Sequence, residues 1–332
     1  MSASKYAVPS GAGFSFREAK REDLQNSDLL SQYFVSASSG MARDLETTAM
    51  RSLLAAGPGP ARTELFAEGV HGSVGCLIAE DKPWDSAMLS VAAKNLFVLA
   101  SPPRGRSRYQ LASRMLDYWL DAYPKSSEGL VTTRIPADDT VLLHALEDHG
   151  FHVLVPMVTL GKALEKVQVG LPSGSSISAV EPGDIDQVER IAATAFLWGR
   201  FTADPSVPGE AAEKIHRTWA RNCFLGTHAN HALVARKKKE VLGFIAMKFQ
   251  MAGDVEVGSI ELIATAATWR GEGIGRALVQ AGCNWLSTSA RYVVVRTELP
   301  NTPALRLYEA QGFRAMNGSL YLNRWQHTIG AK

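Results

Sequence analysis

Two stretches of this 332-residue chain repeat one another, and the repeat constrains the fold more than any other feature of the sequence. Residues 134–151 and 296–313 have the same length, and six of their positions agree without a gap. About one agreement is expected by chance, so the chain is predicted to hold two copies of one structural unit. The matching pairs are Arg134 and Arg296, Thr140 and Thr302, Leu143 and Leu305, Glu147 and Glu309, Gly150 and Gly312, and Phe151 and Phe313.

A second, shorter match lies upstream of this repeat. The Arg-Gly pair at 104–105 precedes Trp119 by the same distance as the pair at 270–271 precedes Trp285. The offset between the copies is 166 residues there and 162 residues in the longer repeat. The first copy is therefore expected to carry about four extra residues, near 123–128.

Composition and length fit two globular domains. The chain is 46% hydrophobic and 20% charged, the balance of an ordinary globular protein. A domain size of roughly 150 residues gives about two domains. The turn-rich stretch 171–176, Leu-Pro-Ser-Gly-Ser-Ser, interrupts the apolar pattern. We predict a first domain over residues 1–165, a linker over 166–176 and a second domain over 177–332.

The pattern of the second copy predicts an α/β (α+β) fold. Its strands first follow one another as an antiparallel meander and then alternate with helices, so each copy is expected to have a mixed central sheet flanked by helices. The expected strands are 14–17 in the first copy and 177–180, 231–236, 241–250, 258–265 and 292–297 in the second, with closing strands up to Trp325. The expected helices of the second copy are 184–196, 208–222, 273–289 and 302–311.

Charge and cysteine content argue against several classes of protein. Thirty-five Lys and Arg against 33 Asp and Glu leave a net charge of +2, which argues against a nucleic-acid partner. No window approaches 18 uninterrupted apolar residues and no apolar signal segment opens the chain, so neither a membrane partner nor export is expected. Three cysteines without a short spacing predict neither disulfides nor a metal site, and a cytoplasmic location is the expectation that follows.

A glycine-bearing loop, residues 270–276, lies between a predicted strand and a long predicted helix. Gly273 and Gly275 let the backbone approach a ligand closely, and the start of a helix offers unpaired N–H groups and the positive end of its dipole. A phosphate cradle is expected, with a tight structural turn as the alternative. The loop follows several strands and lacks a Gly-Lys-Ser/Thr ending, which excludes the Rossmann and Walker motifs.

The loop belongs to a longer pattern that continues downstream: Ile263-Ala264-Thr265, Arg270 to Gly275, Asn301, Ala304, Leu305, Tyr308 and Gly312-Phe313. In order and spacing these residues resemble the acetyl-CoA site of the GNAT superfamily of N-acetyltransferases. The resemblance extends from Ser175 to Trp325 and implies acetyl-CoA as the co-substrate and no metal.

The resemblance also implies how acetyl-CoA would bind. Backbone groups of Ile263 and Thr265 would pair with the pantetheine arm, and the amides from Gly271 to Arg276 would hold the pyrophosphate. Asn301 would contact the pantetheine or cap the next helix. The implied set of binding residues is Ile263, Ala264, Thr265, Arg270, Gly271, Glu272, Gly273, Ile274, Gly275, Arg276, Asn301 and Ala304.

The same resemblance implies direct attack of an amine on the acetyl carbonyl, without a covalent enzyme intermediate. Tyr308 would donate a proton to the departing thiolate as the general acid; the alternative is a core aromatic on an amphipathic helix. Glu298 is the first candidate for the base that takes the amine proton, or for an amine ligand. Glu261 is the second candidate, and a chain of water molecules could replace both.

Arg200, Phe201, Trp219 and Asn222 also carry a closer resemblance, to the dTDP-fucosamine acetyltransferases of this superfamily, and they occupy the region where the superfamily has its acceptor-binding helices. An arginine with aromatic neighbours suits a phosphorylated or nucleotide-linked amine, and packing between helices is the alternative. The implied partner is a small-molecule amine, with a nucleotide-linked amino sugar as the specific candidate. N-acylation of an amino acid, an antibiotic or a protein amine remains open, as does a noncatalytic acyl-CoA-binding module.

The first copy is expected to lack both binding and chemistry. The alignment places Ser107 opposite Gly273 and Tyr109 opposite Gly275, so that a tyrosine side chain would fill the space for the pyrophosphate. It places Leu146 opposite Tyr308. The first domain is therefore expected to be a scaffold or one wall of the acceptor pocket, in a protein that is a monomer or a homodimer.

Overall fold

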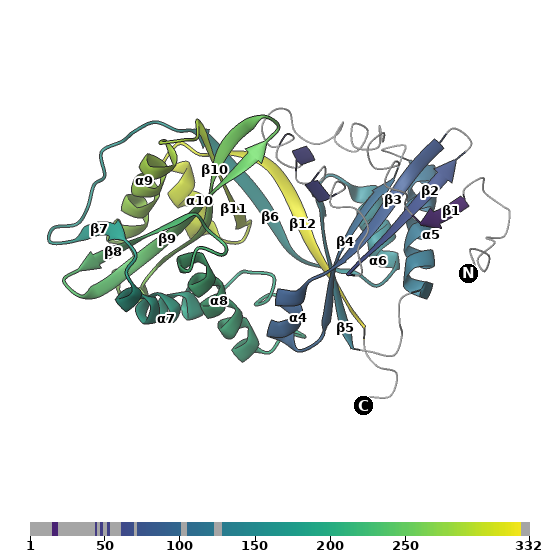
Figure 1. Ribbon diagram of the computed structural model, residues 1–332, viewed down its shortest axis with the longest axis horizontal. Coiled ribbons are helices and arrows are strands. Elements are labelled where there is room, and N and C mark those ends of the chain that lie inside the picture. The colour runs from purple at the N-terminus through teal and green to yellow at the C-terminus, as the bar shows by residue number, and fades with distance from the viewer. Residues whose placement is uncertain are drawn as a thin grey trace. The chain divides into compact units, whose positions relative to one another are not determined.

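The computed structural model describes residues 15–18, 44, 47–48, 52–53, 61–69, 72–100, 105–122 and 128–326. These residues form two compact units, the second of which consists chiefly of residues 154–318. Each unit combines helices with a mixed sheet, which confirms the predicted fold class (Figure 1). Arg104 and residues 123–127, which the upstream match uses, lie outside the described residues, as does Phe14. No helix in the described part is long and apolar enough to cross a membrane.

The sheet of the first unit follows the order β1-β2-β3-β4-β5 and is completed by the end of β12. Strands β4 and β5 are parallel, and the other neighbours pair antiparallel. Apolar side chains of α5 and α6 pack against one face of this sheet and form the core of the unit. The elements are β1 (Ser15–Glu18), β2 (Arg62–Gly69), β3 (Gly72–Asp81), α4 (Pro83–Leu89), β4 (Ala92–Ala100), α5 (Arg106–Ala122), β5 (Gly129–Pro136) and α6 (Thr140–Asp148).

The second unit has the strand order β6-β11-β10-β9-β8-β7, in which only β10 and β11 are parallel. Its elements agree with the predicted order, and one long strand replaces the several closing strands that were expected. They are β6 (His152–Ala163), β7 (Ser176–Ala179), η1 (Pro182–Asp184), α7 (Ile185–Ala195), α8 (Gly209–Phe224), β8 (His231–Lys237), β9 (Glu240–Ala252), β10 (Val255–Thr265), η2 (Ala267–Trp269), α9 (Ile274–Leu286), β11 (Tyr292–Glu298), α10 (Thr302–Glu309) and β12 (Arg314–Gln326).

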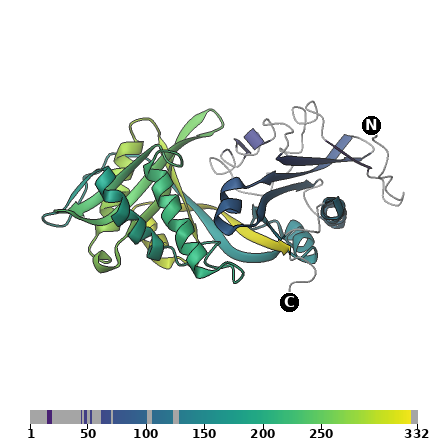
Figure 2. The same cartoon turned by 60° about the horizontal axis from the view of Figure 1, so that its bottom comes forward.

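Helices cover both faces of this second sheet. Alternate residues of β9 point to opposite faces, so Phe244 packs with α7 and α8 whereas Ile245 packs with α9 and α10. In Figure 2, α7 and α8 lie in front of the sheet. The central strand β9 is buried from Val241 to Met247, as expected for a strand covered on both sides.

The units do not follow the predicted domain boundary at two strands. Strand β6 belongs to the first predicted domain, yet its residues 157–163 pair with β11 in the second unit. Strand β12 ends the second predicted domain, yet its residues 319–326 pair with β5 in the first unit. The two halves of the chain thus exchange their last strands. The predicted linker, 166–176, runs along α9, where Val167 exchanges hydrogen bonds with the Asn284 side chain at 2.8 and 2.9 Å.

The repeat is visible in the backbone. Asp139 accepts a hydrogen bond from Leu142 N at the start of α6, and Asn301, at the matching position, accepts one from Ala304 N at the start of α10. After each helix a glycine with positive φ, Gly150 or Gly312, turns the chain. Both helices therefore begin and end through the same local interactions.

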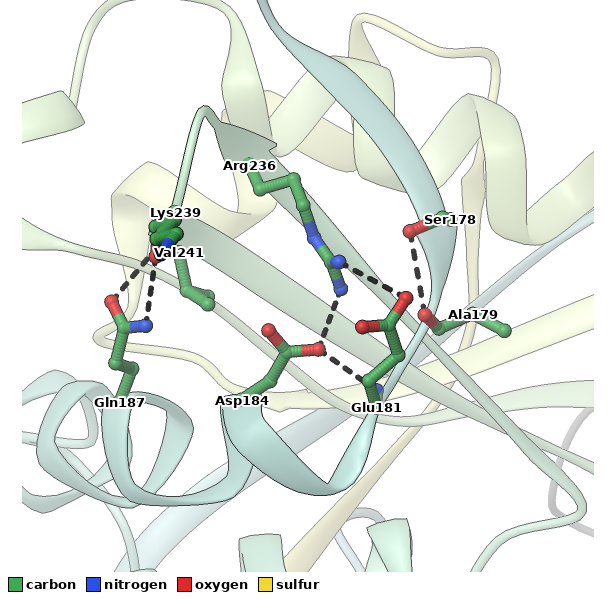
Figure 3. A network of polar contacts seen from close by, with 8 residues as sticks. All are labelled: Ser178, Ala179, Glu181, Asp184, Gln187, Arg236, Lys239 and Val241. Carbon is green, nitrogen blue, oxygen red and sulfur yellow. Dashed lines mark hydrogen bonds and ion pairs between the residues drawn. The ribbon is translucent and has the colours of Figure 1, made fainter.

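An ion-pair network fixes the start of α7 to the hairpin of β8 and β9 (Figure 3). The Arg236 guanidinium lies 2.5 Å from Asp184 Oδ2 and 3.3 Å from Glu181 Oε1. The Gln187 side chain donates to Lys239 O and accepts from Val241 N, both at 3.0 Å. These contacts position α7, whose last residue lies at the cavity described below.

Candidate functional site

The site begins where two parallel strands separate. Strands β10 and β11 pair only from Gly258 to Ile260 on β10, although β10 continues to Thr265. The register against β9 shifts between Ile260 and Leu262, which makes Glu261 a bulged residue. A bulge bends its strand and ends regular pairing. The sheet therefore opens beyond Ile260 and leaves one edge of β10 without β11.

The glycine-bearing loop reaches the start of α9 beside this opening. Gly271 and Gly273 have φ values of 84° and 80°, which an L side chain rarely adopts. Among the described residues, none accepts a hydrogen bond from the backbone N–H groups of 271–276; the next one, Ala277 N, donates to Gly273 O at 3.0 Å. A run of free N–H groups at a helix N-terminus is suited to bind an anion.

A cavity of about 380 Å³ lies between the loop, the end of β10 and the start of α10. Ten residues of the predicted binding set line it, and only Ile263 and Glu272 of that set do not. The predicted residues that line it are Ala264, Thr265, Arg270, Gly271, Gly273, Ile274, Gly275, Arg276, Asn301 and Ala304. Lining residues that the sequence analysis missed are Ala195, Leu197, Trp198, Trp269, Pro303 and Leu307.

Gly275 keeps this cavity open. A Cβ at this position would lie 3.4 Å from Leu307 Cδ2 and 3.6 Å from Thr265 Oγ1, so any longer side chain would enter the space between α9 and α10. Arg270 and Arg276 are exposed beside it and supply positive charge. A ligand can therefore come close to the backbone at Gly275 and to the cationic side chains of Arg270 and Arg276. Both features suit a polyphosphate.

Asn301 has both a structural role and a place at the cavity. Its Oδ1 accepts from Ala304 N at 3.3 Å, and its Nδ2 donates to Thr297 Oγ1 at 3.3 Å. The capping alternative is therefore realised in the structure. Because the same residue lines the cavity, contact with a ligand is compatible with that role.

Tyr308 is on α10, on the helix that supplies Ala304 and Leu307 to the cavity. Its side chain is 2% exposed, and its ring centroid lies 5.4 Å from that of Phe313. Burial, reinforced by the negative charge of Glu298, raises the pKa of the Tyr308 hydroxyl above its ordinary value. The phenol therefore stays protonated at neutral pH.

The two candidate carboxylates lie on the separating strands. Glu298 is the last residue of β11, is partly buried, and accepts a hydrogen bond from Thr297 Oγ1 at 3.4 Å. Glu261 is the bulged residue of β10 and accepts a hydrogen bond from the Ser259 hydroxyl. The charge of Glu298 acts on Tyr308, so Glu298 is the carboxylate that the structure brings near the predicted acid.

The predicted acceptor residues are not among those that line the cavity. Arg200 and Phe201 lie in the turn after α7, where the guanidinium carbon is 3.9 Å from the centre of the Phe201 ring. Trp219 packs against the core beneath α7 and α8. Asn222 lies in the last turn of α8, and its carbonyl accepts from Thr227 N.

His216 was missed by the sequence analysis. It lies on α8, is 3% exposed, and its ring centroid is 5.3 Å from that of Phe196. Burial lowers the pKa of its imidazole to about 4. The sequence could not show that His216 would be buried here. The segment that contacts it lies within 196–208, which forms no regular helix or strand, so no periodic pattern predicts this contact.

The first unit closes the corresponding opening with an ion pair. Pairing of β4 with β5 ends at Leu96, although β4 continues to Ala100. Arg108, at the position of Ile274 in the other copy, donates to Ala100 O at 3.0 Å and forms a buried ion pair with Asp139 at 2.5 Å. Tyr109, opposite Gly275, donates to the Asp148 carboxylate instead.

The second half of the chain matches a family of known proteins. The acetyltransferase (GNAT) family model matches residues 192–313. The chain is 25% identical to the spore coat polysaccharide biosynthesis protein SpsD of Bacillus subtilis over 252 residues, which cover 76% of this chain and 84% of that protein. It is 32% identical to mycothiol acetyltransferase of Actinosynnema mirum over 146 residues, which cover 43% of this chain and 46% of that protein.

Two solved structures share the fold of the whole chain. A GCN5-related N-acetyltransferase from Sphaerobacter thermophilus has a TM-score of 0.64 at 16% identity, over 97% of this chain and 98% of that chain. A tandem GNAT protein from the clavulanic acid biosynthesis pathway, without AcCoA, has a TM-score of 0.58 at 13% identity, over 95% of this chain and 99% of that chain. Through the half that carries the cavity, this chain belongs to the GNAT family of acetyltransferases and is an N-acetyltransferase.

Proposed function

We propose that this chain transfers the acetyl group of acetyl-CoA to the amine of a small molecule, and that the acceptor is a nucleotide-linked amino sugar. The observation that carries the choice of acetyl-CoA is the run of unpartnered N–H groups at 271–276, beside the opening of β10 and β11. The free N–H groups can bind a pyrophosphate, and the open edge of β10 can pair with the amide groups of the pantetheine arm.

The residues present fit this co-substrate. The N–H groups of 271–276 and the side chains of Arg270 and Arg276 would hold the pyrophosphate, and Gly275 leaves the space that it needs. Backbone groups between Ile263 and Thr265 would pair with the pantetheine arm, because β11 leaves this edge of β10 open.

The chemistry is direct transfer from sulfur to nitrogen. The amine attacks the acetyl carbonyl, the new C–N bond forms, and the C–S bond breaks as the thiolate leaves. Tyr308, which stays protonated because burial raises its pKa, gives its proton to the thiolate. Glu298, the neighbouring carboxylate, receives the proton that the amine loses. Glu298 then releases this proton to solvent and the Tyr308 phenolate takes one up, which restores both groups.

The choice of acceptor draws on the relatives. SpsD is named for polysaccharide biosynthesis, which favours a sugar amine. Arg200 beside Phe201 would add a cation and a ring for a phosphorylated or nucleotide-linked acceptor.

The first unit acts as a scaffold in this proposal. Its opening holds the Arg108–Asp139 ion pair, and Leu146 takes the position of the acid Tyr308. A pantetheine arm would have to displace a buried, hydrogen-bonded charge pair, which is costly.

The experiment that tests the proposal follows release of free thiol from acetyl-CoA with a panel of acceptors: dTDP-linked amino sugars, amino acids, polyamines and short peptides. We expect release with the amino sugars. Release only with amino acids or peptides would overturn the acceptor class. Binding of acetyl-CoA without release would favour a noncatalytic binding module.

A further inference from the structure

His216 is a buried polar side chain without a partner. Its ring is 3% exposed, and no described residue forms a hydrogen bond with either ring nitrogen. Buried polar groups are paired in most proteins. The ring lies beside Gly199, which follows the cavity-lining residues Leu197 and Trp198, so an unpaired histidine here points to a group that arrives with a ligand.

Three polar groups converge at Gly199, the residue next to the cavity-lining Trp198. A Cβ on Gly199 would lie 3.6 Å from His216 Nε2, 3.7 Å from Glu298 Oε1 and 3.8 Å from Thr202 Oγ1. Gly199 does not have a positive φ, so its backbone does not require glycine. The missing side chain leaves room between an imidazole and a carboxylate.

These two groups differ in charge. The imidazole is neutral near pH 7 because burial lowers its pKa to about 4, and a neutral imidazole both donates and accepts. The Glu298 carboxylate accepts and carries a negative charge, which suits an amine. A neutral hydroxyl is the natural partner of His216.

We propose that His216 hydrogen-bonds a hydroxyl group next to the reacting amine, while Glu298 receives the amine itself, so that the site selects a vicinal amino alcohol. This inference rests on the proposed function and specifies its acceptor. His216 is then a specificity-determining residue, and the absence of a side chain at Gly199 leaves the imidazole and the carboxylate accessible to each end of the amino alcohol.

The first test compares two amines that differ only in the hydroxyl, trans-2-aminocyclohexanol and cyclohexylamine. We expect kcat/KM of the wild type to favour the amino alcohol by about tenfold or more, because a site built for a hydroxyl rejects an analogue that lacks it.

The variants assign this preference to one residue. His216→Leu should remove the preference by slowing the amino alcohol alone, and His216→Gln should restore part of it. His231→Leu is the matched control, since His231 stacks on Trp285 at 4.7 Å. An unchanged preference in His216→Leu would overturn the inference.

The second test does not depend on turnover or on the stability of a variant. In wild-type protein with ¹⁵N-labelled histidine and bound CoA, the amino alcohol should shift the His216 imidazole resonances and leave those of His231 in place. The His216 resonances are assigned as those that are missing from the spectrum of His216→Gln. Absence of a shift, or an equal shift with cyclohexylamine, contradicts the inference even if thiol release proceeds. Failure of the wild type to bind acetyl-CoA in calorimetry contradicts the proposed function instead.

Discussion

Tyr308 is the single residue on which the proposed chemistry depends most. Tyr308→Phe removes the hydroxyl and keeps the ring that packs on Phe313. We expect kcat to fall roughly a hundredfold, because the thiolate then leaves without a proton donor, while the Kd for acetyl-CoA changes little. Steady-state kinetics and calorimetry measure the two quantities. Tyr292→Phe, on the exposed start of β11, is the matched control, and an equal loss there would exclude a specific role.

The pH dependence of turnover tests the same residue. Burial raises the pKa of Tyr308 above its ordinary value near 10. The protonated form, to which the proposal assigns the activity, therefore persists as the pH rises, and kcat should show no decline from tyrosine ionisation below pH 10. A decline with an apparent pKa well below this value, absent in Tyr308→Phe, would show that the phenol is not held in its neutral form.

Gly275 tests the position of the phosphate site. Gly275→Tyr reproduces the first copy, in which Tyr109 stands at the matching position. The ring would extend past Leu307 and Thr265 into the cavity, so we expect acetyl-CoA binding to be lost in calorimetry. Gly209→Tyr, at the open start of α8, is the control because nothing lies near its Cβ. Retained affinity in Gly275→Tyr would place the phosphate site elsewhere.

At this scale the sequence predicted the loop far better than the acceptor side. The contacts proposed for the loop are made by its backbone, so the glycines at 271, 273 and 275 mark it directly. The proposed acceptor residues would act through side chains on the irregular segment 196–208 and on α8, where no periodic pattern fixes their direction. Trp198 and His216 were missed for this reason, and the roles of Trp219 and Asn222 stay predictions.

At the scale of elements, α7 is held to the sheet by charge as well as by packing. Arg236 on β8 bridges Asp184 and Glu181, which lie at the start of the helix (Figure 3). Arg236→Met should lower the free energy of unfolding by about 1–3 kcal/mol, because Asp184 would stay largely buried without its partner. Urea unfolding measures this loss. Arg190→Met, on the exposed face of α7, should change stability by less than half as much, and equal losses would contradict the role of the network.

Helices and strands with strong patterns were predicted to within a few residues. The helix expected over 302–311 ends at Glu309 because the chain then turns through Gly312, whose φ is 84°. The strand expected to begin at Gly258 begins at Val255, since exposed residues extend its pairing with β9. The first and last residues of a strand depend on which neighbouring strand it pairs with, and a single sequence does not reveal that neighbour.

At the scale of the whole molecule, the exchange of β6 and β12 could not be predicted. The two strands occupy equivalent places in the two copies of the repeat. Nothing in the composition of 152–163 or 314–326 distinguishes the two partners. The turn-rich stretch 171–176 indicated a domain boundary, although the chain there only returns along α9 to begin β7.

The exchange has a consequence for cutting the chain. A protease site inserted after the exposed Gly174 should yield two fragments that stay together in gel filtration, because β6 pairs with β11 over residues 292–298 and β12 pairs with β5 over 129–136. They should separate only in denaturant. Residues 177–332 expressed alone should aggregate, since β11 would present an unpaired edge and the core would lack Leu160. Two fragments that separate and each remain folded would show that every half closes its own sheet.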